Sequence, residues 1–363
     1  MQAGIDQPKA LLAQQGEVVA LPSAFMGRRN FKEPMSGQGT DTRVRSGKLV
    51  GIISHQKPNL FVTEFFPLGR EECRFELIPA LAKASAQGSA VWAIAGYPLL
   101  TGLDHGWREK IMKLYQKIII FSPSLEKDFI AQSFPNARDR QKYLDFFERH
   151  AKKITFAGYL LPQHGVVRDD ENNNLPKPKP LKGACRVAVL RGGGAVYPKL
   201  IAEAIRASDL LGKEYHLTVV AGPSTTRQEW DFFVTLLDNK KINNVVLHSS
   251  VGNYEKLIED SDLCVAMSGY HTSAMLIKHQ KKSIIVPFEG NGILNFHEQS
   301  ARALLLKNII GAKILLAQDL SKNNLAEAVK DAAASPKRTS QGKKEWFTGT
   351  KVLDQSLIGL FGR

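Results

Sequence analysis

The feature that most constrains this chain is a regular alternation between two kinds of segment. Short runs rich in Val, Ile and Phe alternate with segments of helical periodicity along most of the 363 residues. Such alternation is typical of βαβ units, in which helices join parallel strands and cover the sheet. The sequence therefore predicts an α/β fold built on mainly parallel sheets.

The pattern places strands and helices in both halves of the chain. In the first half we expect strands at 18–21, 60–63, 90–95, 117–121 and 154–157, and helices at 43–55, 72–85, 105–115 and 124–132. In the second half we expect strands at 185–190, 216–221, 245–248, 263–266, 283–286 and 313–316. Helices follow these strands at 196–211, 227–238, 254–259, 272–279, 298–306 and 320–334. This second series is long enough for a complete doubly wound domain.

A polar segment separates the two series. Residues 168–182, RDDENNNLPKPKPLK, have no apolar periodicity, and their alternating Pro and Lys residues favour extended backbone. We therefore expect two Rossmann-like doubly wound domains, at 1–167 and 183–334, joined by this linker. The tail, 335–363, is either a closing helix that packs back across the linker or a frayed terminus.

Composition limits the classes of function. No apolar stretch approaches the length of a membrane-spanning helix, and the first residues lack the pattern of a secretion signal. Three widely spaced cysteines are typical of reduced thiols, so we expect a cytoplasmic protein. The net charge of +14 favours anionic partners, but no nucleic-acid-binding motif accompanies it, and we expect no nucleic-acid partner.

Glycine and small polar residues follow three strands of the second half, where ligands of doubly wound sheets bind. The first turn contains Gly192, Gly193 and Gly194, and the second contains Ser268, Gly269, Tyr270, His271 and Thr272. The third leads to His297, Glu298 and Gln299, whose side chains suit sugar hydroxyls. Backbone amides at such turns can approach a phosphate, although tight packing and helix capping also call for these residue types.

Six segments in fixed order resemble a known family. VAVLRGGGAVYPKLIAEAI, LTVVAGPS, YEKLIEDSDLCVAMSGYHTSAMLI and KKSIIVPFEGNGILNFHEQSARALLL resemble the C-terminal domain of family-28-type glycosyltransferases, which have the GT-B fold. That family includes the peptidoglycan N-acetylglucosaminyltransferase. The chain is more closely similar to a group of bacterial proteins predicted to be glycosyltransferases, because its first half also carries FVTEFFPLGREECRFELIPAL and ITFAGYLLP, which resemble the N-terminal features of that group.

The resemblance implies a donor nucleotide sugar, most often UDP-linked, bound by the C-terminal domain as a co-substrate without a further cofactor. It assigns Gly192 to Gly194 to the diphosphate or the acceptor side of the cleft, and the segment from Ser268 to Thr272 to the donor phosphates. His297, Glu298 and Gln299 would meet the sugar, and Ser249 would border the base through its backbone.

Two departures from the family pattern leave other functions open. Met275 stands where the peptidoglycan enzyme has an acidic residue for the ribose hydroxyls, and a thioether cannot replace a carboxylate there. The chain also opens beyond the family's first strand and its glycine-rich loop ending in GH, so we expect an incomplete or shortened N-terminal domain. A nucleotide-sugar hydrolase and an inactive nucleotide-binding relative are the alternatives.

Catalytic candidates must then come from other strand ends of the first half. Our choice of base is Glu64, directly after a strand, or His105, among candidates that also include Glu71, Glu76 and Asp104. Glu64 could instead pair with Arg70 or cap the Gly69 loop, and His105 could be a helix cap. Arg70 and Arg191 would offset charge on the leaving diphosphate.

With no aspartate pair of DxD spacing at a strand end, we expect an inverting transfer that needs no metal. The basic charge favours an acidic or lipid-linked acceptor, with peripheral contact at the inner face of the membrane.

Overall fold

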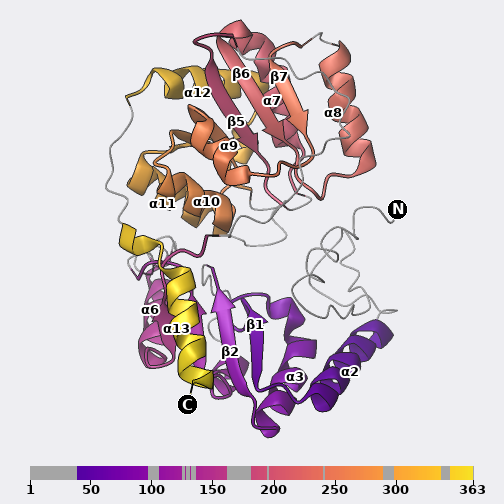
Figure 1. Ribbon diagram of the computed structural model, residues 1–363, viewed down its shortest axis with the longest axis vertical. Coiled ribbons are helices and arrows are strands. Elements are labelled where there is room, and N and C mark those ends of the chain that lie inside the picture. Colours follow the sequence, from indigo (N-terminus) through magenta and orange to yellow (C-terminus); the bar gives the residue numbers. More distant parts are fainter. Residues whose placement is uncertain are drawn as a thin grey trace. The chain divides into compact units, whose positions relative to one another are not determined.

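The computed structural model describes residues 39–96, 106–124, 127, 131, 136–161, 181–193, 196–239, 242–288, 298–336 and 344–362. They divide into two compact units, each with its own sheet (Figure 1). We call the described residues from 39 to 160, together with 344–362, the N-terminal unit, and those from 161 to 336 the C-terminal unit. The predicted strand at 18–21 and nearly all of the predicted linker lie outside the described residues.

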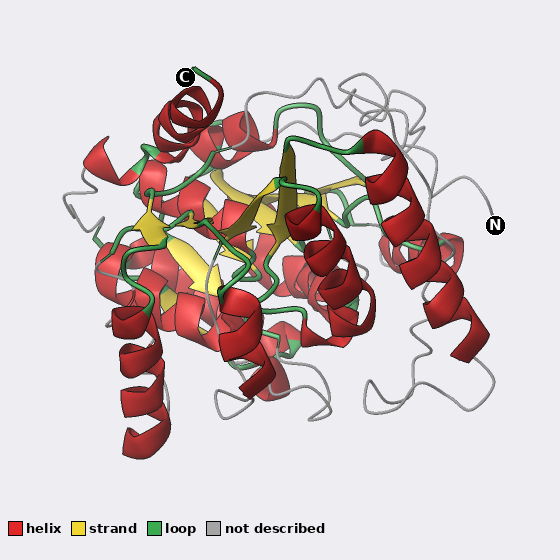
Figure 2. Ribbon diagram, turned by 90° about the horizontal axis from the view of Figure 1, so that it is seen from below, coloured by secondary structure: helices red, strands yellow, loops and turns green. Residues whose placement is uncertain are grey.

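The N-terminal unit holds a parallel sheet with the strand order β1-β2-β3-β4. Its strands are β1 (Leu60–Glu64), β2 (Ala90–Ala95), β3 (Lys117–Ile120) and β4 (Ile154–Phe156). Its helices include α2 (Gly39–Gln56), α3 (Arg74–Ala86), α4 (Gly106–Met112) and α6 (Ala137–Arg149). Helix α2 packs along α3, where Arg45 forms an ion pair with Glu76 at 2.8 Å. Figure 2 shows helices flanking the strands.

The C-terminal unit holds a parallel sheet with the order β10-β9-β8-β5-β6-β7. Its strands are β5 (Cys185–Leu190), β6 (Tyr215–Val220), β7 (Val245–His248), β8 (Leu263–Ala266), β9 (Ser283–Ile285) and β10 (Lys313–Ile314). Its helices are α7 (Lys199–Leu211), α8 (Arg227–Asn239), α9 (Tyr254–Asp260), α10 (Tyr270–Lys278), α11 (Glu298–Ile310) and α12 (Lys322–Ala334). From β5 the chain adds β6 and β7 on one side and β8 to β10 on the other, so the switch point of the topology lies between β5 and β8.

Apolar packing on both faces fixes the strands that carry this switch point. All four residues of β8 are buried, as are the last four of β5. Val187 and Val189 belong to one core cluster with Ile201 of α7 and Val329 of α12. Each such side chain contributes about 1.5–3 kcal/mol when it is removed from water, so the strand ends stand on a rigid base.

The last helix, α13 (Gly349–Phe361), packs on the N-terminal unit. The Gly349 amide donates to the Tyr159 carbonyl at 3.1 Å, and Lys117 Nζ donates to Ser356 Oγ at 2.7 Å. The Tyr159 and Phe347 rings lie 5.5 Å apart. The tail therefore contains a helix that packs on the N-terminal unit, whereas nearly all of the linker lies outside the described residues. None of the helices among the described residues is long and apolar enough to cross a membrane.

Candidate functional site

The turns predicted to hold a ligand leave the sheet at one edge. Strands β9, β8 and β5 are parallel neighbours, with Leu190 paired to Ala266 and Ala266 paired to Ile285. The segments that follow these residues therefore emerge side by side at the carboxyl ends of the strands. Two of them flank the switch point between β5 and β8, where open parallel sheets bind ligands.

The turn after β5 is held tightly from one side and open on the other. Gly192 has a φ of 85°, a left-handed conformation that favours glycine, and Ser224 Oγ donates to the Gly193 carbonyl at 2.8 Å. A Cβ on Gly222, in the turn after β6, would collide with the Gly192 carbonyl oxygen. A Cβ on Gly192 or Gly193 would meet nothing within 4 Å, so these glycines border open space. Gly194 lies outside the described residues.

The buried side chain of Arg191 fixes this turn. Its side chain is fully buried, and its Nε donates to the Val196 carbonyl at 2.7 Å. Its other nitrogens lie 3.4 Å from the Glu229 carboxylate and 3.5 Å from Thr225 Oγ1. The guanidinium thus ties the turn after β5 to the turn after β6, and Glu229 balances its charge.

The turn after β8 opens into the first turn of α10. Gly269 is the N-cap residue, with φ −63° and ψ 152°, and a Cβ there would meet nothing within 4 Å. Helix geometry leaves first-turn amides without an acceptor inside the helix, and the summed peptide dipoles put about half a positive charge at this end. The buried Thr272 hydroxyl lies 3.1 Å from Tyr254 Oη, and burial raises the pKa of Tyr254. Tyr270 and His271 follow Gly269, with their rings 5.1 Å apart.

The turns after β8 and β9 are bonded to the start of α11. Ser268 Oγ donates to the Gln299 carbonyl at 2.7 Å, and the Phe288 amide donates to Gln299 Oε1 at 3.0 Å. Arg302 donates to the Ser268 carbonyl at 2.5 Å and forms an ion pair with Glu298. The structure therefore brings Glu298 and Gln299 close to Ser268. His297 lies outside the described residues.

Two further positions that the sequence analysis singled out lie in the C-terminal unit. Ser249 directly follows β7, two strands from β5, at the same edge of the sheet. Met275 is 4% exposed and lies on a run of buried residues in α10. Its side chain is therefore part of the packed interior.

In the N-terminal unit, Glu64 ends β1 as an exposed carboxylate. Of the candidate bases that the structure describes, Glu71 forms an ion pair with Arg108, and Glu76 pairs with Arg45. Among the residues that the structure describes, Glu64 forms no ion pair and no side-chain hydrogen bond, so the alternative pairing with Arg70 is not formed. The Arg70 guanidinium instead lies over the Phe65 ring, 5.6 Å from its centre. Asp104 and His105 lie outside the described residues.

Buried hydrogen bonds fix the turn that follows Glu64. Phe65 and Arg70 have φ values of 62° and 54°, so two residues with side chains hold left-handed conformations. Thr63 Oγ1 donates to the Phe66 carbonyl at 2.6 Å, and Arg108 Nε donates to the Pro67 carbonyl at 3.0 Å. These contacts allow Glu64 and Arg70 to stand on a rigid turn.

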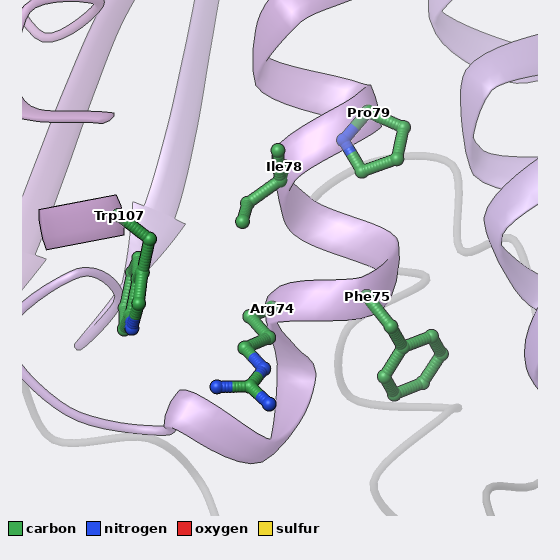
Figure 3. Close-up of a pocket in the computed structure, with 5 residues that line it drawn as sticks. All are labelled: Arg74, Phe75, Ile78, Pro79 and Trp107. Carbon is green, nitrogen blue, oxygen red and sulfur yellow. The ribbon is translucent and has the colours of Figure 1, made fainter. Parts of the chain in front are cut away.

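A shallow pocket of about 410 Å³ opens beside this turn (Figure 3). Its lining residues are Arg74, Phe75, Ile78, Pro79 and Trp107. The Trp107 ring stacks on Phe66 at 5.6 Å between centroids, and its buried Nε1 has no hydrogen-bond partner among the described residues. The exposed Arg74 guanidinium adds a positive charge to walls that are otherwise apolar.

The comparison with protein families decides the assignment of the C-terminal unit. Residues 187–355 match the glycosyltransferase family 28 C-terminal domain. This region is similar to that domain, and we refer to it as the family 28 domain. The match begins in β5 and extends into α13, so the family 28 domain includes all three turns at the switch edge.

Solved structures extend the likeness to nearly the whole chain. CalG4, the calicheamicin glycosyltransferase, has a TM-score of 0.61 and 14% identity, over 98% of this chain and 88% of its own. MurG of Acinetobacter baumannii has a TM-score of 0.51 and 13% identity, over 96% of this chain and 86% of its own. The spinosyn rhamnosyltransferase SpnG, complexed with thymidine diphosphate, has a TM-score of 0.50 and 11% identity, over 89% of this chain and 76% of its own. A search of curated proteins finds no match.

At these identities the likeness establishes the fold. The family 28 domain and the parallel sheet of the N-terminal unit confirm the predicted α/β class, and the similar structures are glycosyltransferases of the GT-B fold.

Sequence reasoning missed the residue that joins two of the turns in the family 28 domain. Arg302 stands four residues after Glu298, a spacing that is typical of exposed ion pairs on helices. Only its burial and its bond to Ser268 reveal another role.

Proposed function

We propose that this chain transfers a sugar from a UDP-linked donor to an acceptor with inversion. The observation that carries the proposal is the meeting of three turns at the switch edge of a family 28 domain. Open space in front of Gly193 and Gly269, beside the positive end of α10, suits a diphosphate.

The donor would lie along this edge. The Gly192–Gly193 turn, together with Gly194, and the segment from Ser268 to Thr272 would hold the diphosphate. Glu298 and Gln299, with His297, would meet the sugar, and the backbone near Ser249 would border the base. The thymidine diphosphate bound to SpnG supports a nucleoside diphosphate as the leaving group.

Charge on the leaving diphosphate would be offset by amides, by the α10 dipole and by Arg70. The exposed Arg70 guanidinium forms no ion pair with the described residues, so its charge is available to a ligand. Arg191 would act indirectly, because its guanidinium is fully buried and fixes the glycine turn. Such fixed donors stabilise developing charge without a metal ion or other cofactor. We therefore expect transfer in the presence of EDTA.

The acceptor would meet the N-terminal unit. Glu64 would remove the proton from the attacking hydroxyl, with His105 as the second candidate. Arg70 and Arg74 favour an acidic acceptor, and the apolar pocket beside them suits a hydrophobic portion such as a lipid. Contact with a membrane surface is part of this proposal.

Ligand-induced stabilisation tests the donor assignment. UDP, UDP-N-acetylglucosamine, UDP-glucose and thymidine diphosphate would each be added to the full chain. A ligand at 100 times its dissociation constant stabilises the folded state by about 2.7 kcal/mol, which raises the melting temperature of a domain this size by about 5–10 °C.

The matched variants are Gly269→Val and Gly47→Val, since both glycines border open space but only Gly269 lies at the switch edge. We expect Gly269→Val to weaken nucleotide binding by at least about tenfold and Gly47→Val to leave it unchanged. Equal binding by both variants, or no response to any nucleotide, would refute the donor site. Product analysis then separates transfer from hydrolysis of the donor and from binding without turnover.

A further inference from the structure

Arg302 lies at the centre of the bonds between α11 and the turn after β8. The residue is 3% exposed, although it carries a charge. Its Nε donates to the Ser268 carbonyl at 2.5 Å, while Nη1 forms the ion pair with Glu298. One guanidinium therefore bonds to a main-chain atom of the turn after β8 and to a side chain of α11.

A second tie runs in parallel with the first. Ser268 Oγ donates to the Gln299 carbonyl at 2.7 Å, and Gln299 Oε1 accepts from the Phe288 amide at 3.0 Å. Neither the turn after β8 nor the start of α11 can shift without breaking buried hydrogen bonds, and a buried polar group left without its partner destabilises the fold. The two ties make the turns after β8 and β9 and the first turn of α11 one rigid group.

We propose that Arg302 is a positioning residue that couples the diphosphate subsite to the sugar subsite. This inference rests on the proposed function. Because Ser268 precedes Gly269 and Glu298 precedes Gln299, Arg302 sets the separation between groups that would bind the two parts of one donor. Fixed spacing lets the binding energy of the diphosphate orient the sugar.

The role requires the shape of arginine as well as its charge. The guanidinium is a planar fork whose nitrogens reach two acceptors in different directions, whereas a lysine ammonium is a compact charge. Arg302→Lys therefore keeps the positive charge but cannot reproduce both bonds. Arg302→Met keeps much of the buried volume and removes both.

A purely structural role must be distinguished, because losing any buried guanidinium destabilises a protein. Arg108 is the matched control in the N-terminal unit. It is 1% exposed, donates through Nε to the Pro67 carbonyl at 3.0 Å and forms an ion pair with Glu71. Arg108→Met removes the same kinds of contact in the N-terminal unit, whereas Ser268 belongs to the C-terminal unit.

The first experiment is hydrogen exchange of the ligand-free chain. The amides of Met267, Ser273 and Phe288 are the probes, since each donates to an acceptor at these turns. We expect Arg302→Met and Arg302→Lys to exchange at least about tenfold faster there than wild type, with Arg108→Met unchanged at the same amides. If the Arg302 variants exchange no faster than Arg108→Met, the positioning role is wrong, whether or not the chain binds nucleotides.

The second experiment compares affinities for UDP and for UDP-N-acetylglucosamine. Coupling predicts that Arg302→Lys loses more affinity for the sugar nucleotide than for UDP, by about fivefold or more in the ratio of dissociation constants. An unchanged ratio would overturn the coupling. Failure of the wild-type chain to bind either nucleotide would instead refute the proposed function, while the exchange measurement still decides whether Arg302 positions the turns.

Discussion

At the scale of single residues, the partners of a side chain separate candidates that the sequence treats alike. Glu64, Glu71 and Glu76 all lie at or beyond the end of β1. Two of them neutralise buried or half-buried arginines, because a charge withdrawn from water must be paired. Glu64 has no such partner in the described part of the chain, which leaves its carboxylate available to accept a proton.

The corresponding prediction concerns Glu64→Gln. The amide keeps the size of the side chain but cannot act as a base, so we expect the rate of sugar transfer to fall by about 10²–10⁴-fold. Nucleotide binding should stay unchanged, because the proposed donor site lies on the C-terminal unit. Steady-state kinetics and UDP titration give the two values.

Glu148→Gln is the control for this variant, since Glu148 is an exposed carboxylate on α6 of the same unit. Its transfer rate should equal that of wild type. Full activity in Glu64→Gln would transfer the role of base to another group, with His105→Asn the next variant to measure.

At the scale of elements, the sequence predicts strands better than helices. The strands at 90–95, 185–190, 245–248 and 263–266 have the predicted bounds, because strands covered on both faces are continuous apolar runs. Helix α6 was missed, since its many charges hide three buried aromatic residues. Its start carries a signal nonetheless, as Asn136 caps the helix by accepting from the Arg138 amide at 2.8 Å.

The ties between turns could not be predicted in the same way. The sequence places Gly192, Ser268 and Glu298 at strand ends or helix starts, because local patterns define those places. Whether an arginine is buried depends on contacts across the fold. Arg191 bonds to Glu229, 38 positions away, and Arg302 bonds to Ser268, 34 positions away.

The packing of helix α13 at Gly349 predicts how a substitution there affects stability. A Cβ at this position would lie 2.8 Å from both the Leu160 nitrogen and the Tyr159 oxygen, so the helix start fits against residues 159–160 only without a side chain. We expect Gly349→Val to lower the free energy of unfolding by about 1–3 kcal/mol. Denaturant unfolding followed by circular dichroism measures the loss.

Gly359→Val is the matched variant, because Gly359 lies on the same helix and borders open space. It should change the free energy of unfolding by less than about 1 kcal/mol. Similar losses in the two variants would mean that the fit between α13 and residues 159–160 contributes little to stability.

At the scale of the whole molecule, chain order and charge act together. The chain forms the sheet of the N-terminal unit, then that of the C-terminal unit, and returns with α13 to the first. Over this assembly the sequence carries 49 Lys and Arg residues against 35 Asp and Glu, a net charge of +14. Such a field raises the rate at which anions arrive, and it acts at distances where no single contact matters.

The field predicts a salt dependence that separates charge from fit. Raising the ionic strength from about 0.01 M to about 0.15 M shortens the Debye length from about 30 Å to about 8 Å. We expect the association rate of UDP, measured by stopped flow, to fall by about 3- to 10-fold over this range, with a smaller change in its dissociation rate. Uridine has the same base and ribose without the phosphates, so its association rate should stay nearly constant. A UDP association rate as insensitive to salt as that of uridine would mean that the charges of this chain are spread too evenly to steer a donor, and that recognition begins only at the turns themselves.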